Sequence, residues 1–84
     1  MPPFDFTQAH QIIGERLRLI REEQTKSITE AATEAGIAPQ MLSKIEDGKA
    51  NFRILTLGKL CKAYKVSLEK LLEDFRPGSA QESP

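Results

Sequence analysis

The sequence of 84 residues predicts an all-α fold of five helices around one core. Apolar residues recur at intervals of three and four from about residue 7 to residue 75, which is the spacing of one helix face. Signals that start and stop helices fall between these apolar groups. No segment alternates strictly between apolar and polar residues, as a half-buried strand would. These three observations predict one compact helical domain.

The first helix is predicted from Thr7, which can cap its N-terminus, to about Glu23. Its apolar face consists of Ile13, Leu17 and Ile20, with Ile12 and Leu19 at the margins.

The second helix is predicted from the pair Ser27 and Glu30, which have the three-residue spacing of a capping box. It continues to Ala35. Gly36 is expected to end it, because glycine tolerates the positive φ of a tight turn.

The third helix is predicted from Pro39 to about Asp47. Proline suits the first turn of a helix, because its missing amide hydrogen would have no partner there. Gly48 is placed as the left-handed stop.

The last two helices follow a loop at residues 49–52. The fourth has the apolar pattern Ile54, Leu57, Leu60, Cys61 and Tyr64. After a break at residues 65–67, Ser67 is expected to cap the fifth helix. That helix has the apolar residues Leu68, Leu71, Leu72 and Phe75.

The distribution of proline, glycine and polar residues predicts the domain limits. We expect a flexible N-terminal arm at residues 1–6, one folded domain at residues 7–75 and a disordered C-terminal tail at residues 76–84.

The charge and the cysteine content limit the functional classes and the cellular location that the chain can have. The chain has 12 basic and 12 acidic residues, so it lacks the strong basic field of an unselective nucleic-acid binder. Zero net charge remains compatible with a protein that reads a nucleic-acid sequence with one well-placed helix. Cys61 is the only cysteine, and no apolar run suits a signal peptide or a membrane span, so a cytoplasmic location is expected.

The stretch from Ile28 to Asp47 has the spacing of a helix-turn-helix. Two helices that cross steeply over a short turn need a small residue where they touch, which is Ala32, and a turn residue such as Gly36.

The third helix is expected to be anchored by Leu42 and Ile45, which leaves its other face exposed. Glutamine can pair with adenine, lysine with guanine acceptors and serine with several bases. The exposed face therefore suits the major groove of DNA; it consists of Gln40, Ser43, Lys44 and Asp47. In isolation, the simpler interpretation is a solvated helix face.

Over roughly Ile13 to Leu72, the chain resembles the phage-repressor/Cro-type (Xre-like) helix-turn-helix proteins. The resemblance rests on Arg16-Leu17-Arg18, Arg21-Glu22, Ala32, Gly36-Ile37, the run from Leu42 to Lys49, Asn51, Thr56-Leu57, Lys59-Leu60 and the run from Val66 to Leu72. It implies a compact five-helix lambda-repressor-like DNA-binding domain. It also implies a transcriptional regulator, which we expect to be a repressor.

The resemblance implies roles for individual residues. The base-reading set is Pro39, Gln40, Met41, Ser43 and Lys44. The phosphate-contacting set is Lys49, Asn51, Arg53 and, through its backbone amide only, Ile28. Arg21 and Glu46 correspond to a partly buried structural ion pair.

Four positions depart from the family pattern. Ile28 stands where many members have glutamine, so the side-chain phosphate contact of those members is lost. The other three departures are Lys26, Ala31 and Phe52. These three predict a thinly packed second helix, with Phe52 filling the space.

A homodimer is expected, because one short recognition helix touches too few base pairs to be specific alone. Operators of this kind are two-fold symmetric, with half-sites about 34 Å apart. The apolar face of the fifth helix can fold inward, form the dimer seam, or do both. The expected contributors to the seam are Val66, Leu68, Leu72 and Phe75.

Other residues are interpreted as structural. Arg16 and Arg18 are expected to be solvated charges, His10 a surface residue and Cys61 a buried apolar residue. One histidine and one cysteine do not supply the three or four ligands of a zinc site. We therefore expect no metal and no cofactor.

Two alternatives come from other functional classes. An antitoxin-like module would bind a toxin partner and DNA only secondarily. An enzyme is disfavoured, because no nucleophile, base and orienting group fall together and there is no glycine-rich phosphate loop. Among regulators, a Cro-like repressor, a restriction-modification controller and a self-regulating repressor are equally compatible with the sequence.

Overall fold

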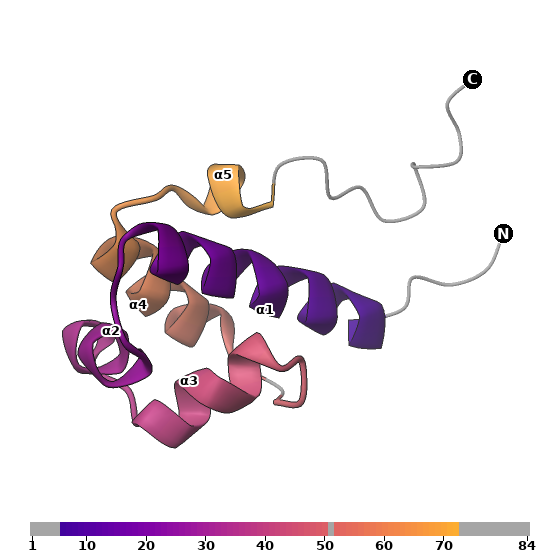
Figure 1. The fold of residues 1–84 in the computed structure, drawn as a ribbon. Helices are drawn as coiled ribbons and strands as arrows, with labels where there is room; N and C mark the ends of the chain where they lie inside the picture. Colours follow the sequence, from indigo (N-terminus) through magenta and orange to yellow (C-terminus); the bar gives the residue numbers. More distant parts are fainter. Residues whose placement is uncertain (1–5, 51, 73–84) are drawn as a thin grey trace, which may run out of the picture.

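The computed structural model describes residues 6–50 and 52–72, which form five helices and no strand (Figure 1). The predicted all-α, five-helix fold is therefore confirmed. The helices are α1 (Phe6–Glu23), α2 (Ile28–Ala35), α3 (Pro39–Glu46), α4 (Ile54–Tyr64) and α5 (Leu68–Leu71). The predicted disordered tail, residues 1–5 of the predicted arm, Asn51 and Phe75 lie outside the described residues.

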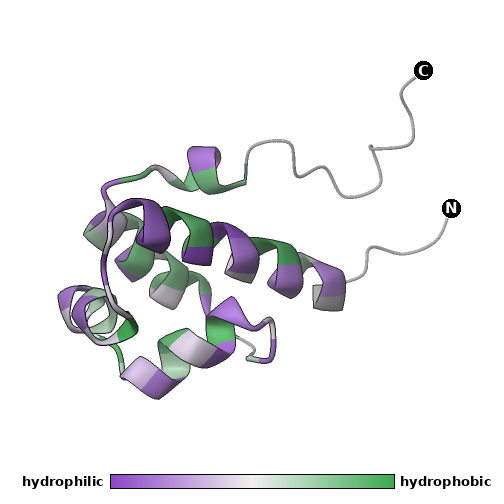
Figure 2. Ribbon diagram, in the orientation of Figure 1, coloured by the Kyte–Doolittle hydropathy of each residue, from purple (hydrophilic) through white to green (hydrophobic). Residues whose placement is uncertain are grey.

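The long helix α1 organises the bundle (Figure 1). It packs on α3 along one side and on α5 along another, while α2 packs on both α3 and α4. Hydrophilic and hydrophobic residues alternate along α1, as expected of a helix with one buried face (Figure 2). Six large side chains are completely buried in the core: Leu17, Leu42, Ile45, Leu60, Tyr64 and Leu71.

The capping signals of α2 and α3 are observed as predicted. The Ser27 hydroxyl accepts a hydrogen bond from the Glu30 amide at 3.0 Å, and the Ser27 amide donates to the Glu30 carboxylate at 2.8 Å. Gly36 and Gly48 have φ values of 75° and 71°, so both occupy the left-handed region in which glycine is favoured.

The outer helices end differently from the prediction. Helix α1 already includes Phe6, so Thr7 lies inside the helix instead of capping it. Ser67 does cap α5, by accepting a hydrogen bond from the Lys70 amide at 2.9 Å. That helix ends at Leu71, however, and is only four residues long.

Three interpretations of individual residues require correction. Arg16 is not simply solvated, because it donates a hydrogen bond to the Leu71 carbonyl at 2.8 Å. His10 is half-buried, with its ring centroid 5.2 Å from that of Phe52. Phe52 itself is half-buried and packs against the hydrophobic core. Ile54, which the apolar pattern assigned to the core, is 66% exposed.

Candidate nucleic-acid interface

Helix α3 is fixed by its buried face. Leu42 and Ile45 are completely buried, and α3 packs against both α1 and α2. The predicted small contact residue Ala32 is also completely buried. The two helices of the motif are thus held together by apolar contacts, and the face of α3 that carries Leu42 and Ile45 is turned toward the core.

Gly14 allows α1 to approach the end of α3 closely, a feature that the sequence analysis missed. A β-carbon at this position would lie 2.1 Å from the carbonyl oxygen of Ile45. Glycine inside a helix costs about 1 kcal/mol relative to alanine, so its presence there signals a packing requirement. That signal was available in the sequence, although the identity of the neighbour was not.

An ion pair joins α1 to the last turn of α3. The Nε atom of Arg21 lies 2.7 Å from one carboxylate oxygen of Glu46, and its Nη2 atom lies 3.0 Å from the other. The Glu46 side chain is 4% exposed and that of Arg21 13% exposed. The hydrogen bonds to Glu46 raise the pKa of Arg21, although burial opposes this shift.

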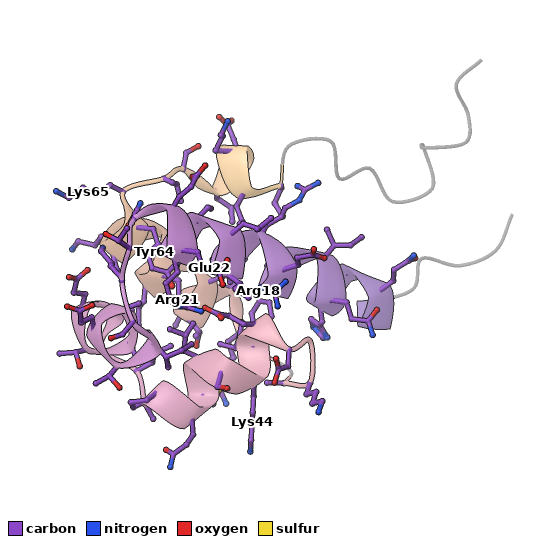
Figure 3. The ribbon with its side chains drawn as sticks, in the orientation of Figure 1. Arg18, Arg21, Glu22, Lys44, Tyr64 and Lys65 are labelled. Atoms are coloured by element: carbon purple, nitrogen blue, oxygen red, sulfur yellow. The ribbon has the colours of Figure 1, made fainter. Side chains whose placement is uncertain are left out.

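Arg21 has a third partner. Its Nη1 atom donates to the Lys26 carbonyl at 2.9 Å, so one guanidinium holds α1, α3 and the segment that enters α2. Figure 3 shows Arg21 between these elements. A planar side chain with several fixed donors suits such a three-way junction.

The opposite face of α3 is open to solvent. All five residues of the predicted base-reading set are exposed, and Lys44 projects away from the bundle (Figure 3). Met41, although apolar, is 41% exposed. The fold therefore brings these side chains together on one accessible helix: Pro39, Gln40, Met41, Ser43 and Lys44.

The predicted phosphate-contacting residues lie at element ends. Ile28 begins α2 and is half-buried against the core, which leaves its backbone amide as the relevant group. Lys49 and Arg53 are exposed, and Arg53 occupies the N-cap position of α4. Asn51 is outside the described residues.

The predicted dimer residues are only partly available. Val66 and Leu72 are half-buried against the core, and Leu68 is 38% exposed. Phe75 is outside the described residues. More apolar surface is exposed at the start of α4, where Ile54 and Leu55 are 66% and 73% exposed.

The described part of the chain has no cluster of metal-binding side chains and no membrane-spanning helix. Within it, no group of three or more histidine, cysteine, aspartate or glutamate side chains is arranged to hold a metal ion. Cys61 is buried, as predicted, and desolvation raises the pKa of its thiol. No helix in residues 6–50 or 52–72 has the length and apolar character required to cross a membrane.

Comparison with known proteins identifies related chains. The family model described as Helix-turn-helix matches residues 17–71. The HTH-type transcriptional repressor RghR of Bacillus subtilis (strain 168) is 34% identical over 70 residues. The match covers 82% of this chain and 50% of RghR, so the chain spans half the length of that relative.

Two solved structures have a similar fold. A chain of the SinR protein/SinI protein complex is 36% identical, with a TM-score of 0.69; the match covers 74% of this chain and 61% of that one. The restriction-modification controller protein C.AhdI from Aeromonas hydrophila is 23% identical, with a TM-score of 0.74. This second match covers 76% of this chain and 97% of that one, and it supports the fold alone.

Proposed function

The chain belongs to the helix-turn-helix family, and on that premise we propose that it is a transcriptional regulator that binds double-stranded DNA through α3. The observation that carries the proposal is the two-sided character of α3. One side is fixed by Leu42, Ile45 and the Arg21–Glu46 ion pair, while the other presents polar side chains to solvent. Family membership also confirms the prediction that the chain is not an enzyme.

Gln40, Ser43 and Lys44 are proposed to read base edges in the major groove. A glutamine amide can pair with adenine, and a lysine ammonium can donate to the acceptors of guanine. Pro39 and Met41 flank them and complete the contact surface, with the exposed methionine suited to apolar contact with a thymine methyl group.

Lys49, Asn51, Arg53 and the amide of Ile28 are proposed to contact phosphates. Such contacts set the register of the protein on DNA, whereas the base contacts supply specificity. The start of α2 is suited to this role, because the first amides of a helix have no intrahelical partner and favour anions.

We further propose that the regulator is a cytoplasmic repressor that acts as a homodimer on a palindromic operator. Two copies are needed because one α3 reads few base pairs, and half-sites about 34 Å apart match such a dimer. The proposed contact surface includes the exposed part of the predicted set Val66, Leu68, Leu72 and Phe75. Ile54 and Leu55 offer further exposed apolar area for it.

The kind of control is proposed from the relatives. RghR is named a repressor, so repression of a small operon is the proposed role. Control of a restriction-modification system stays a prediction from the sequence. The match to a chain of the SinR/SinI complex supports a protein partner as well as DNA. A toxin partner, as in the antitoxin-like alternative, stays a prediction.

The function can be tested by selecting bound sites from a random duplex library. We expect a palindromic motif. On the selected duplex, Gln40→Ala and Lys44→Ala should each weaken binding by about 1 to 3 kcal/mol, with little change on random DNA. Lys49→Ala should weaken both alike and reduce the salt dependence by about one unit of slope.

Lys62→Ala is the matched control for charge. It removes one exposed lysine from α4 instead of α3 and should leave both affinities unchanged. The proposal would be refuted by failure to enrich any motif. Equal losses on selected and random DNA for Gln40→Ala, Lys44→Ala and Lys49→Ala would refute the assigned roles.

A further inference from the structure

A groove of about 500 Å³ lies between the C-terminal end of α2 and the second half of α4. It is not formed by any residue assigned to DNA contact. Its lining residues are Glu34, Ala35, Gly36, Lys59, Lys62, Ala63 and Lys65.

The rim of the groove is positively charged. Lys59, Lys62 and Lys65 follow one another at intervals of three residues, so they lie along one side of α4 and its C-cap. All three are exposed, and none has an ion-pair partner within residues 6–50 and 52–72. In a chain of zero net charge, these three lysines concentrate positive charge locally.

The acidic residue in the lining does not neutralise this rim. Glu34 forms an ion pair with Lys26, whose Nζ atom lies 2.6 Å from the Glu34 carboxylate. Lys26 is outside the lining and comes from the segment before α2. The charge of Glu34 is therefore already balanced, and three positive charges face the groove.

The floor of the groove is made of small residues. Ala35, Gly36 and Ala63 present little side-chain volume, and the position of a β-carbon on Gly36 would have no atom within 4 Å. A partner backbone can therefore approach closely.

We infer that this groove binds an acidic segment of a partner protein. The interval of three residues from Lys59 to Lys62 corresponds to about 4.5 Å of rise along α4. On a partner helix, the β-carbons of acidic residues three or four positions apart are separated by about 5 to 6 Å, which is a comparable spacing. Ion pairs at such a rim favour fast, salt-sensitive association and selection of an oppositely charged partner.

The geometry favours a protein over the DNA proposed to contact α3. Figure 3 shows Lys65 at the end of α4 and Lys44 projecting from α3 on another side of the bundle. A duplex seated on Lys44 therefore leaves the groove uncovered. DNA and an acidic partner would bind separate faces of one molecule.

The inference can be tested on the full chain with a synthetic helical peptide that carries glutamate at every third or fourth position. The matched control peptide has glutamine at these positions. Backbone amide shifts in NMR spectra should change at residues 34–36 and 59–65 with the glutamate peptide only. The affinity should fall as salt is added.

Two double variants distinguish the groove from general charge attraction. Lys59→Glu with Lys62→Glu should weaken peptide binding at least tenfold. Lys44→Glu with Lys49→Glu makes the same charge change on the proposed DNA side and should leave peptide binding within twofold. Because all four lysines are exposed, the melting temperatures should stay near that of the parent chain. Lys62→Gln replaces the first double variant if that variant fails to fold, and should weaken binding at least twofold.

The inference is overturned by three results: equal losses in both double variants, shifts spread over the whole surface, or no binding of the glutamate peptide at low salt. Shifts at the groove caused by a random DNA duplex would also overturn it, because the rim would then be a phosphate site. Selection of DNA motifs is a separate measurement, so failure here leaves the proposed function intact.

Discussion

The contact between α1 and α3 and the space between α2 and α4 are both helix-to-helix boundaries, but they are built in opposite ways. The first is closed by Gly14, which removes a side chain, and by the buried Arg21–Glu46 ion pair. The second has small residues at the floor and lysine side chains at the rim, and a groove of about 500 Å³ remains between the two helices.

The two boundaries meet different structural requirements. The helix proposed to read DNA has to keep one orientation, since a recognition surface displaced slightly loses its contacts. Close packing and the ion pair are therefore placed where α3 meets α1. The α2–α4 boundary carries no such requirement, and its surface remains available to a partner.

The largest expected effect on stability comes from adding a side chain at Gly14. Gly14→Ala should lower the free energy of unfolding by at least about 3 kcal/mol, because the added methyl group collides with the Ile45 carbonyl and forces the two helices apart. Denaturant unfolding followed by circular dichroism measures the loss. The matched control is Gly58→Ala in α4, where no atom lies within 4 Å, and it should stabilise the chain by up to about 1 kcal/mol. Equal effects at the two glycines would show that the α1–α3 boundary is not closed.

The second-largest effect on stability is expected from breaking the Arg21–Glu46 ion pair. Glu46→Ala should destabilise the chain by about 3 kcal/mol, because it leaves the guanidinium of Arg21 partly buried without its carboxylate. The double variant Arg21→Met with Glu46→Leu should recover most of this loss, since it removes both charges and keeps apolar volume. A double variant no more stable than Glu46→Ala would contradict this account. The same denaturation measurement serves both.

A smaller effect on stability is expected at high pH from Tyr64, whose side chain is completely buried in the core. Desolvation raises the pKa of its hydroxyl from the ordinary 10.0 to about 12. Between pH 10 and 12 the unfolded chain loses this proton while the folded chain keeps it, so stability should fall as pH rises by about 2 to 3 kcal/mol. Burial also raises the pKa of the Cys61 thiol, which contributes in the same direction.

Tyr64 is the only tyrosine, so ultraviolet absorbance of tyrosinate follows its titration directly. In Tyr64→Phe, the alkaline loss should shrink to the part due to Cys61. At neutral pH this variant should be as stable as the parent chain or slightly more stable, because the hydroxyl has no hydrogen-bond partner among the described residues. Titration of the folded chain with a midpoint near pH 10 would refute the assigned burial.

Much of the fold was predictable because its signals are local. The capping box of Ser27 and Glu30, the turn at Gly36 and the proline at the start of α3 each depend on a few adjacent residues. The apolar anchors Leu42 and Ile45 follow from periodicity in the same way.

What the sequence did not predict depends on contacts between distant residues. Arg16 bonds to Leu71 across 55 positions, and His10 meets Phe52, so neither behaves as an isolated surface residue. Ile54 fits a helical pattern, but the pattern does not report that the first turn of α4 extends beyond the core. The pattern of apolar residues likewise does not predict the groove, because the groove depends on how α2 and α4 are placed relative to each other.

The burial of Cys61 has one more consequence. The chain has a single cysteine and no tryptophan, and this thiol packs in the core beside Leu57 and Leu60. A thiol reagent reaches it only when α4 separates from its neighbours. The rate at which the thiol of the unaltered chain is modified therefore measures how often α4 opens. Comparing this rate with and without duplex or peptide shows which ligand slows the opening.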